Sequence, residues 1–311
     1  MTEAISPPDR RETRGLALGF VGVVIFAMTL PMTRLAVGTA AAPQLPPLFV
    51  TAGSAAFAAA LAVACLLAVR APWPRREHRV ALFVCALGTV VGFPLFLALA
   101  LRHVGAMHAA VVTGVLPLAT AIAAAVAFRQ RPSPGFWSCV ALGCALVLGF
   151  AAWQGSGTLG VGDVLLLGSV ASAAVGYVAG ARLSAQMPAE RVICWVLVLS
   201  LPVTLAAWPA HAASPAAWAG LGYVTVFSMW LGFFAWYRGL ALGGTVRVSQ
   251  VQLVQPFLSM LFAVPLLGER LDVTTLAFAL AVVATVFVGR AMPVARAPVA
   301  AVAAGMTAAR T

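Results

Sequence analysis

The strongest constraint on this chain is its alternation of long apolar runs with short polar or proline-rich breaks. A run of about 20 apolar residues is long enough to cross the roughly 30 Å hydrocarbon core of a bilayer as a helix. Ten such runs can be placed along the 311 residues. Their predicted limits are 15–37, 47–69, 79–101, 105–128, 135–153, 161–183, 191–208, 216–238, 245–267 and 273–289. The sequence therefore predicts an all-α membrane protein with ten transmembrane helices.

The composition supports a membrane protein and excludes a water-soluble fold. Hydrophobic residues make up 62% of the chain and charged residues only 9%, too few to cover the surface of a soluble protein of this size. The five cysteines all lie within apolar runs, where they act as small hydrophobic residues. We expect no metal site, no disulfide and no cofactor. The short breaks leave no room for a domain outside the membrane.

The basic residues predict the orientation of the helices. All 19 are arginines, and they give the chain a net charge of +11. In the predicted topology 16 of them lie on the side that carries both termini, and three, Arg34, Arg102 and Arg270, lie on the opposite side. Arginine-rich loops face the cytoplasm. We therefore expect both termini in the cytoplasm and contact of the basic loops with anionic membrane lipids rather than with nucleic acid.

The two halves of the sequence align with each other, at an offset of 148 residues near the start of each half and of 139 farther along. An offset of 139 brings Gly105 onto Gly244 and Pro117 onto Pro256. The predicted organisation is a tail at 1–14, a first five-helix repeat at 15–153, a second at 161–289 and a tail at 290–311. Because five is odd, the second repeat would enter the membrane from the opposite side, as in alternating-access transporters with a central cavity. Chance alignment of Ala-, Leu- and Val-rich helices is the alternative.

These features resemble a known family. Ten helices in two sets of five, a proline midway along the fourth and ninth, and the string GERLD at 268–272 are similar to the EamA-type exporters of the drug/metabolite transporter (DMT) superfamily. Within that branch the chain resembles bacterial exporters of the YddG type. The resemblance implies export of neutral and aromatic amino acids and related small metabolites across the bacterial inner (plasma) membrane. One departure is Gln130, where the second repeat has Glu269.

Polar residues at membrane depth are the best candidates for a substrate site, because lipid cannot satisfy them. The ninth predicted helix has a stripe at steps of three and four residues, formed by Ser249, Gln252, Pro256 and Ser259, with Gln255 beside it. The corresponding face of the fourth helix carries Thr113, Pro117 and Thr120. We expect Gln252, Gln255, Ser259 and Thr113 to bind substrate. The alternative is that these side chains only join helices to one another.

Further candidates lie on the eighth, sixth and first predicted helices. Trp230 and Phe234 belong to an aromatic stripe near the membrane centre, where cavity lining and lipid or core packing are both open. Tyr177 and Met28 complete the set of expected substrate contacts. Proline interrupts helical hydrogen bonding. Pro31, Pro94, Pro117 and Pro256 are therefore candidate helix breaks and hinges.

The acidic residues indicate how transport is driven. None of the eight lies deep in a predicted span, and ion coupling usually depends on buried carboxylates. His108 is the candidate proton site. We therefore expect facilitative transport of a small-molecule substrate. Export of lipophilic or cationic drugs, with or without proton coupling, is the alternative. The sequence does not favour an intramembrane enzyme, which needs a cluster of ionisable groups at membrane depth, or a channel, which needs pore-lining charges.

Overall fold

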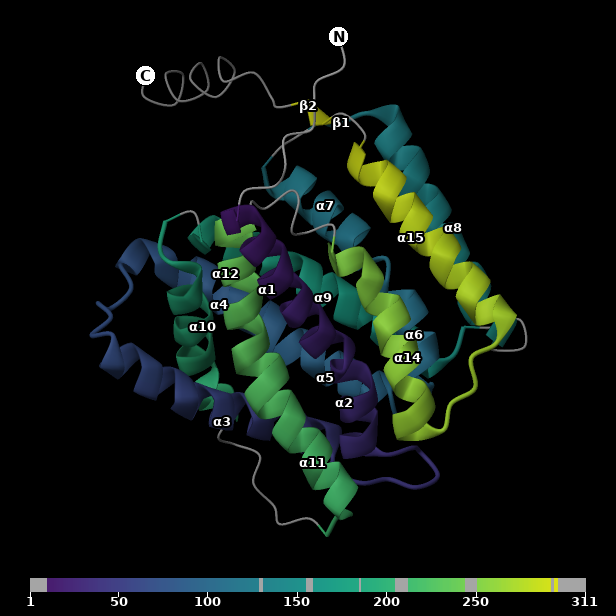
Figure 1. Ribbon diagram of the computed structural model, residues 1–311, viewed down its shortest axis with the longest axis horizontal. Helices are drawn as coiled ribbons and strands as arrows, with labels where there is room; N and C mark the ends of the chain where they lie inside the picture. The colour runs from purple at the N-terminus through teal and green to yellow at the C-terminus, as the bar shows by residue number, and fades with distance from the viewer. Residues whose placement is uncertain are drawn as a thin grey trace, which may run out of the picture.

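The protein is a bundle of helices (Figure 1). The computed structural model describes residues 10–128, 131–154, 159–184, 186–204, 212–243, 251–291 and 294–295. Within these ranges, seven helices are long and apolar enough to cross a membrane, and two shorter apolar helices follow them. The seven are Thr13–Val37, Pro47–Ala68, Arg76–Ala100, Ala106–Ala127, Pro134–Gln154, Val161–Ser184 and Pro215–Trp236. The shorter two are Val251–Leu267 and Val273–Gly289.

The predicted count of ten stays a prediction. A helix of 16 residues, α10 (Ala189–Thr204), lies where the seventh span is expected. The spans predicted at 191–208 and 245–267 both extend into residues outside the described part of the chain, and Ser249 lies there as well. One small departure from an all-α chain is also present. The strands β1 (Arg131–Pro132) and β2 (Val294–Ala295) form a two-residue antiparallel pair.

Several of the spans are interrupted by turns or by changes of helix type. In chain order the first half contains α1 (Arg10–Ala27), α2 (Thr29–Val37), α3 (Pro47–Ala68), η1 (Arg76–His78), α4 (Arg79–Cys85), η2 (Ala86–Gly92), α5 (Phe93–Ala100), α6 (Ala106–Thr113), α7 (Leu116–Ala127) and α8 (Pro134–Gln154). The second half contains α9 (Val161–Ser184), α10, α11 (Pro215–Tyr223), η3 (Val224–Leu231), α12 (Gly232–Gly243), η4 (Val251–Val254), α14 (Gln255–Leu267) and α15 (Val273–Ala291). Both η2 and η3 are π-helical.

Prolines account for several of these interruptions. Pro31 follows the turn between α1 and α2, and Pro94 follows the π-helical segment η2. A proline has no N–H to donate to the carbonyl four residues earlier, so the helix kinks or changes its hydrogen-bonding pattern there. The four candidate prolines therefore coincide with irregular backbone or lie one turn from it. This irregular backbone provides the walls of the site described below.

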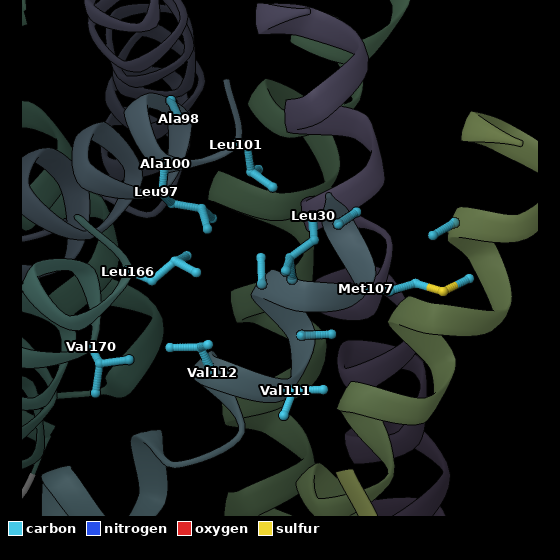
Figure 2. Close-up of a cluster of buried hydrophobic side chains, with 14 of the residues drawn as sticks. Leu30, Leu97, Ala98, Ala100, Leu101, Met107, Val111, Val112, Leu166 and Val170 are labelled. Atoms are coloured by element: carbon cyan, nitrogen blue, oxygen red, sulfur yellow. The ribbon is translucent and has the colours of Figure 1, made fainter. Parts of the chain in front are cut away.

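The most extensive helix contacts join one half of the chain to the other. The most extensive pairs are α1 with α12, α3 with α10, α5 and α7 with α9, and α8 with α15. In Figure 1, α8 and α15 run side by side along one edge of the bundle. A buried apolar cluster joins α2, α5, α6 and α9; Figure 2 shows Leu30, Leu97, Val112 and Leu166 from these four helices. This cluster lies next to the cavity, because Leu30 and Leu97 also line it.

Backbones approach very closely at two of the helix crossings. A Cβ atom added to Gly88 of η2 would lie 2.6 Å from the Cα of Gly176 in α9. One added to Gly239 of α12 would lie 2.6 Å from the backbone nitrogen of Gly19 in α1. Small residues allow this kind of contact between membrane helices, where dispersion forces dominate association. Gly19 and Gly176 therefore allow close packing of the first and sixth predicted helices against their neighbours.

Candidate functional site

A cavity lies among the irregular segments of the bundle. It has about 110 Å³ of space that the centre of a water molecule can occupy. Its walls come from both halves of the chain, including α2, α3, α5, α6 and α7 from the first and α9, η3, η4 and α14 from the second. Val283 is the one residue that α15 contributes, and α8 contributes none of the described lining residues. The cavity is therefore enclosed by the helices that carry the polar stripes.

The polar side chains in the cavity wall are uncharged. They are Thr29, Thr33, Thr51, Ser54, Thr89, Thr113, Tyr177, Ser228, Gln252, Gln255 and Ser259. Phe26, Phe93 and Phe233 add aromatic surface. Among the described lining residues there is no Asp, Glu, Arg or His. A fixed charge in such an apolar setting would need a counter-charge, so this wall is suited to a ligand that brings no net charge.

Two helix breaks of the same geometry contribute to the wall. Pro117 is the second residue of α7, and Pro256 is the second residue of α14. The residues that precede these helices have nearly the same backbone angles, with φ −78° and ψ −8° at Val115 and φ −81° and ψ −16° at Val254. Pro117 has no N–H to donate to the Thr113 carbonyl, and Pro256 has none to donate to the Gln252 carbonyl. Hydrogen-bonding backbone groups are thereby left beside the cavity.

Most of the predicted site residues come together at this cavity. Those that line it are Thr113, Tyr177, Gln252, Gln255 and Ser259, together with the helix-break residues Pro94, Pro117 and Pro256. The Ser259 hydroxyl donates to the Ala27 carbonyl at 2.8 Å, and the Thr113 hydroxyl donates to the Ala109 carbonyl at 2.7 Å. These two hydroxyls therefore already have partners within the protein.

The other predicted residues lie outside the described lining. Trp230 and Phe234 form an edge-to-face pair with ring centroids 5.2 Å apart and pack against a second buried cluster around α3, α4 and α10. The Trp230 indole lies near the Cys194 thiol in that cluster. Met28 forms the turn between α1 and α2, and Pro31 is buried one turn later. Their neighbours Thr29, Leu30 and Thr33 line the cavity instead.

Two contributions to the cavity wall were not predicted from the sequence, one from the second predicted helix and one from a hydroxyl pair. Thr51 and Ser54 of α3 both line the cavity, and their spacing of three residues on a helix could have indicated a shared face. The hydroxyls of Thr29 and Ser228 lie 2.7 Å apart and link α2 to η3. That pairing joins residues 199 positions apart, so no local pattern could have revealed it.

A second polar group, here called the end cluster, comprises Arg34, His108, Asp163 and Glu269. Both carboxylate oxygens of Glu269 accept hydrogen bonds from the first backbone N–H groups of α6, from Ala106 at 2.7 Å and from Met107 at 2.8 Å. Arg34 donates to the Val104 carbonyl at 3.0 Å. A carboxylate at a helix N-terminus is favoured by the helix dipole and by the free N–H groups. The loop after α14 therefore holds the start of α6.

His108 has a buried acidic partner in the end cluster. Its Nε2 lies 2.6 Å from the Asp163 Oδ1, and Asp163 is only 4% exposed. The other Asp163 oxygen accepts from the Gly160 backbone N–H at 2.9 Å. Asp163 stands in the first turn of α9, at the edge of a span as expected, but its burial and its pairing with His108 were not predicted. The pair connects α6 to α9 and lies outside the cavity lining.

The acidic residue that precedes α15 acts as a helix cap. Asp272 accepts from the Thr275 backbone N–H at 2.7 Å and from the Thr275 hydroxyl at 2.6 Å. These two hydrogen bonds hold the pKa of Asp272 below its ordinary value of 3.8. Within the described part of the chain, no three His, Cys, Asp or Glu side chains are arranged to hold a metal ion. The hydrogen bonds of Asp272 therefore stabilise the start of α15.

Comparison with known proteins identifies the chain's relatives. The EamA-like transporter family model matches it twice, over residues 13–151 and 160–289. An uncharacterized transporter of Bacillus subtilis (strain 168), YdeK, is 42% identical over 288 residues, covering 90% of this chain and 98% of that protein. A solved crystal structure with 19% identity aligns over 89% of this chain and 96% of the other, with a TM-score of 0.58, which indicates a shared fold. Together with its apolar spans, these matches show that the chain is a multi-pass membrane protein and belongs to the EamA-like transporter family of the DMT superfamily.

Proposed function

We propose that this transporter exports neutral and aromatic amino acids and related small metabolites by alternating access, down the substrate's own gradient. In this proposal it has ten transmembrane helices in two inverted repeats, and both termini face the cytoplasm of a bacterial inner membrane. The functional resemblance is to exporters of the YddG type. The arginine distribution supports the orientation, because 16 of the 19 arginines fall on the side that carries the termini.

The observation that carries the proposal is the uncharged wall of the cavity. A zwitterion has no net charge but has strong donors and acceptors at one end, so it suits a wall of hydroxyls, amides and open backbone groups. Phe26, Phe93 and Phe233 offer surface for an aromatic side chain. A phosphorylated or strongly anionic substrate would instead require arginine in the wall. Arg34 follows Thr33 of the cavity wall in sequence, but its side chain donates to the Val104 backbone carbonyl instead.

The two halves also share unusual backbone at the offset of 139 residues found in the sequence. The π-helical segment 86–92 maps onto 225–231, which lies within the second π-helical segment, Val224–Leu231. Val115 maps onto Val254, and these residues precede the two proline breaks. Such recurrence supports a duplicated unit. Substrate sites between such units, at broken helices, are typical of transporters with internal repeats.

The end cluster favours proton coupling as a second candidate. His108 and Asp163 are close and largely buried, and a pair of this kind can take up a proton. Neither residue is among the described residues of the cavity wall, so substrate and proton would have to be linked through the movement of α6. Facilitative transport requires no such link. For this reason we retain it as the proposal.

Proteoliposomes containing the purified protein test the proposal. Vesicles preloaded with unlabelled phenylalanine should take up labelled phenylalanine with no imposed ion gradient, and cationic dyes should not compete. Protein-free vesicles and vesicles with heat-denatured protein are the controls. Transport of cationic dyes with no amino-acid counterflow would favour the drug-export alternative. Amino-acid accumulation only under a proton gradient would favour proton coupling.

A further inference from the structure

The hydroxyl of Thr51 differs from those of several other helical threonines in this protein. Threonine hydroxyls within helices usually bond a backbone carbonyl one turn earlier. Thr89, Thr113 and Thr225 do so here, at distances of 2.7 to 2.8 Å. Thr51 stands in α3, is 3% exposed and lines the cavity, yet its Oγ1 has no hydrogen-bond partner. This hydroxyl is therefore left for a ligand.

The side-chain oxygen of Gln255 is in the same condition. Its Oε1 is buried without a hydrogen-bond partner, and Gln255 lines the same cavity at the first turn of α14. Its neighbour in sequence is Pro256, at the helix break. Leaving a buried polar atom unpaired costs free energy, so most buried polar atoms in native proteins have a hydrogen-bond partner, which can be a bound ligand. Two of them in one cavity wall indicate a polar ligand.

The two atoms differ in what they can bind. An amide oxygen only accepts hydrogen bonds, whereas a hydroxyl can also donate one. Because the described cavity wall has no ionised side chain, both charged groups of a zwitterion must be met by neutral partners. We propose that Gln255 accepts a hydrogen bond from the substrate's ammonium group and that Thr51 donates one to its carboxylate. This assignment rests on the proposed function, and it makes these two residues determinants of specificity at opposite ends of the substrate's polar group.

Matched ligands separate the two roles. The probes are L-phenylalanine, its N,N,N-trimethyl derivative, which keeps the positive charge but has no N–H donor, and L-phenylalaninol, which has a hydroxyl in place of the carboxylate. Binding to the purified full-length protein is measured by competition with labelled phenylalanine or by thermal shift. The wild type should prefer phenylalanine to each analogue by about 10- to 150-fold, the range for a hydrogen bond to a charged group.

The variants should lose these preferences one at a time. Gln255→Leu should bind phenylalanine about as weakly as the trimethyl derivative while still preferring phenylalanine to phenylalaninol. Thr51→Val should show the reverse pattern, and Thr51→Ser, which restores the hydroxyl, should behave like the wild type. Thr225→Val is the matched control, because Thr225 is also buried but its hydroxyl is bonded to Leu221 and it lies outside the cavity lining. Its preferences should not change.

The outcomes distinguish this assignment from the proposed function. Retention of both preferences in folded Thr51→Val and Gln255→Leu would overturn the assignment, even if phenylalanine is a substrate. If the wild type binds no amino acid, the amino-acid proposal fails and so does the role of Thr51 at a carboxylate. The role of Gln255 is then tested with 2-phenylethylamine and its trimethylammonium analogue. Loss of discrimination in Gln255→Leu supports that role, whereas unchanged discrimination or no binding of either amine overturns it.

Discussion

The hydroxyl of Ser259 donates a hydrogen bond of 2.8 Å to the carbonyl oxygen of Ala27. Pro31 follows Ala27 by four residues and has no N–H to offer it, so α14 supplies the donor that the first span lacks. Ser259 is 1% exposed although it contributes to the cavity wall. Its position fits the role of joining helices as well as that of binding substrate, and the two can be separated by experiment.

We expect Ser259→Ala to destabilise the protein by about 1 kcal/mol, because it leaves the Ala27 carbonyl unpaired in a setting that water does not reach. Pro31→Ala restores a backbone N–H to that carbonyl. The cost of Ser259→Ala should therefore be smaller in a Pro31→Ala background. Unfolding of the four proteins of this double-mutant cycle in detergent measures the coupling. A coupling of zero would show that the hydrogen bond does not compensate for the proline.

Glu269→Ala should loosen the start of α6. It removes the acceptor for the N–H groups of Ala106 and Met107, and loss of a helix cap typically costs about 0.5 to 2 kcal/mol. Hydrogen exchange in a peptide spanning residues 104–113 should become faster. Glu77→Ala is the control, because Glu77 is an exposed partner of Arg75 at 3.5 Å and such pairs contribute little. Equal effects of both substitutions would argue against the cap.

Gly88→Ala should disturb the contact between η2 and α9. The new Cβ would lie 2.6 Å from the Cα of Gly176 and 2.6 Å from the Ser172 carbonyl oxygen, and neither backbone atom can move aside locally. Overpacking of this kind costs about 1 to 3 kcal/mol. Gly53→Ala in α3 is the matched control, because nothing lies within 4 Å of a Cβ there. Thermal unfolding of the two variants should rank them in that order, and equal stability would contradict the close contact.

The cap formed by Asp272 should depend on pH. Its pKa is lowered in the folded protein, so the carboxylate stabilises the fold at neutral pH and the contribution is lost as the pH falls through that lowered pKa, below about 3.8. Asp272→Ala should cost about 0.5 to 2 kcal/mol at pH 7 and less at pH 3. Asp272→Asn, which keeps an acceptor, should cost less than Asp272→Ala at each pH, and its cost should fall equally at low pH because neither replacement titrates. A cost of Asp272→Ala independent of pH would refute this account.

His108→Ala should leave phenylalanine counterflow without an ion gradient close to that of the wild type. His108 contacts Asp163 in the end cluster and is not among the described residues of the cavity wall. The effect is measured as the initial rate of exchange in proteoliposomes at two pH values. Uptake above equilibrium under a proton gradient in the wild type, abolished by His108→Ala, would show that transport is coupled.

Sequence alone was informative about where helices break and which residues surround the cavity. Pro117 and Pro256 stand at irregular backbone because proline removes a donor wherever it occurs in a helix. Thr113, Gln252 and Gln255 line the cavity because polar groups in an apolar chain turn away from lipid. Both rules act on single residues or on one helix. They therefore require no knowledge of how helices are arranged.

Contacts between distant helices were beyond such rules. Trp230 belongs to an aromatic stripe, and the sequence does not show which neighbour that stripe contacts. In the structure Trp230 packs against the buried apolar cluster around α3, α4 and α10 rather than along the cavity. The pairing of His108 with Asp163 depends on the crossing of α6 over the start of α9. Thr51 and Ser54 share one face of α3, but their spacing does not show whether that face lies toward the cavity or toward another helix. Only the arrangement of α3 beside the cavity gives it a role.

The glycine contacts determine which parts of the bundle can move as one. Backbones that touch, as at Gly19 with Gly239 and at Gly88 with Gly176, have no side-chain layer in which one helix could slide on the other. Each contact joins a helix from the first half of the chain to one from the second. We therefore expect α1 to move together with α12 and η2 together with α9, so that any boundary between moving parts would not follow the boundary between the two halves of the sequence.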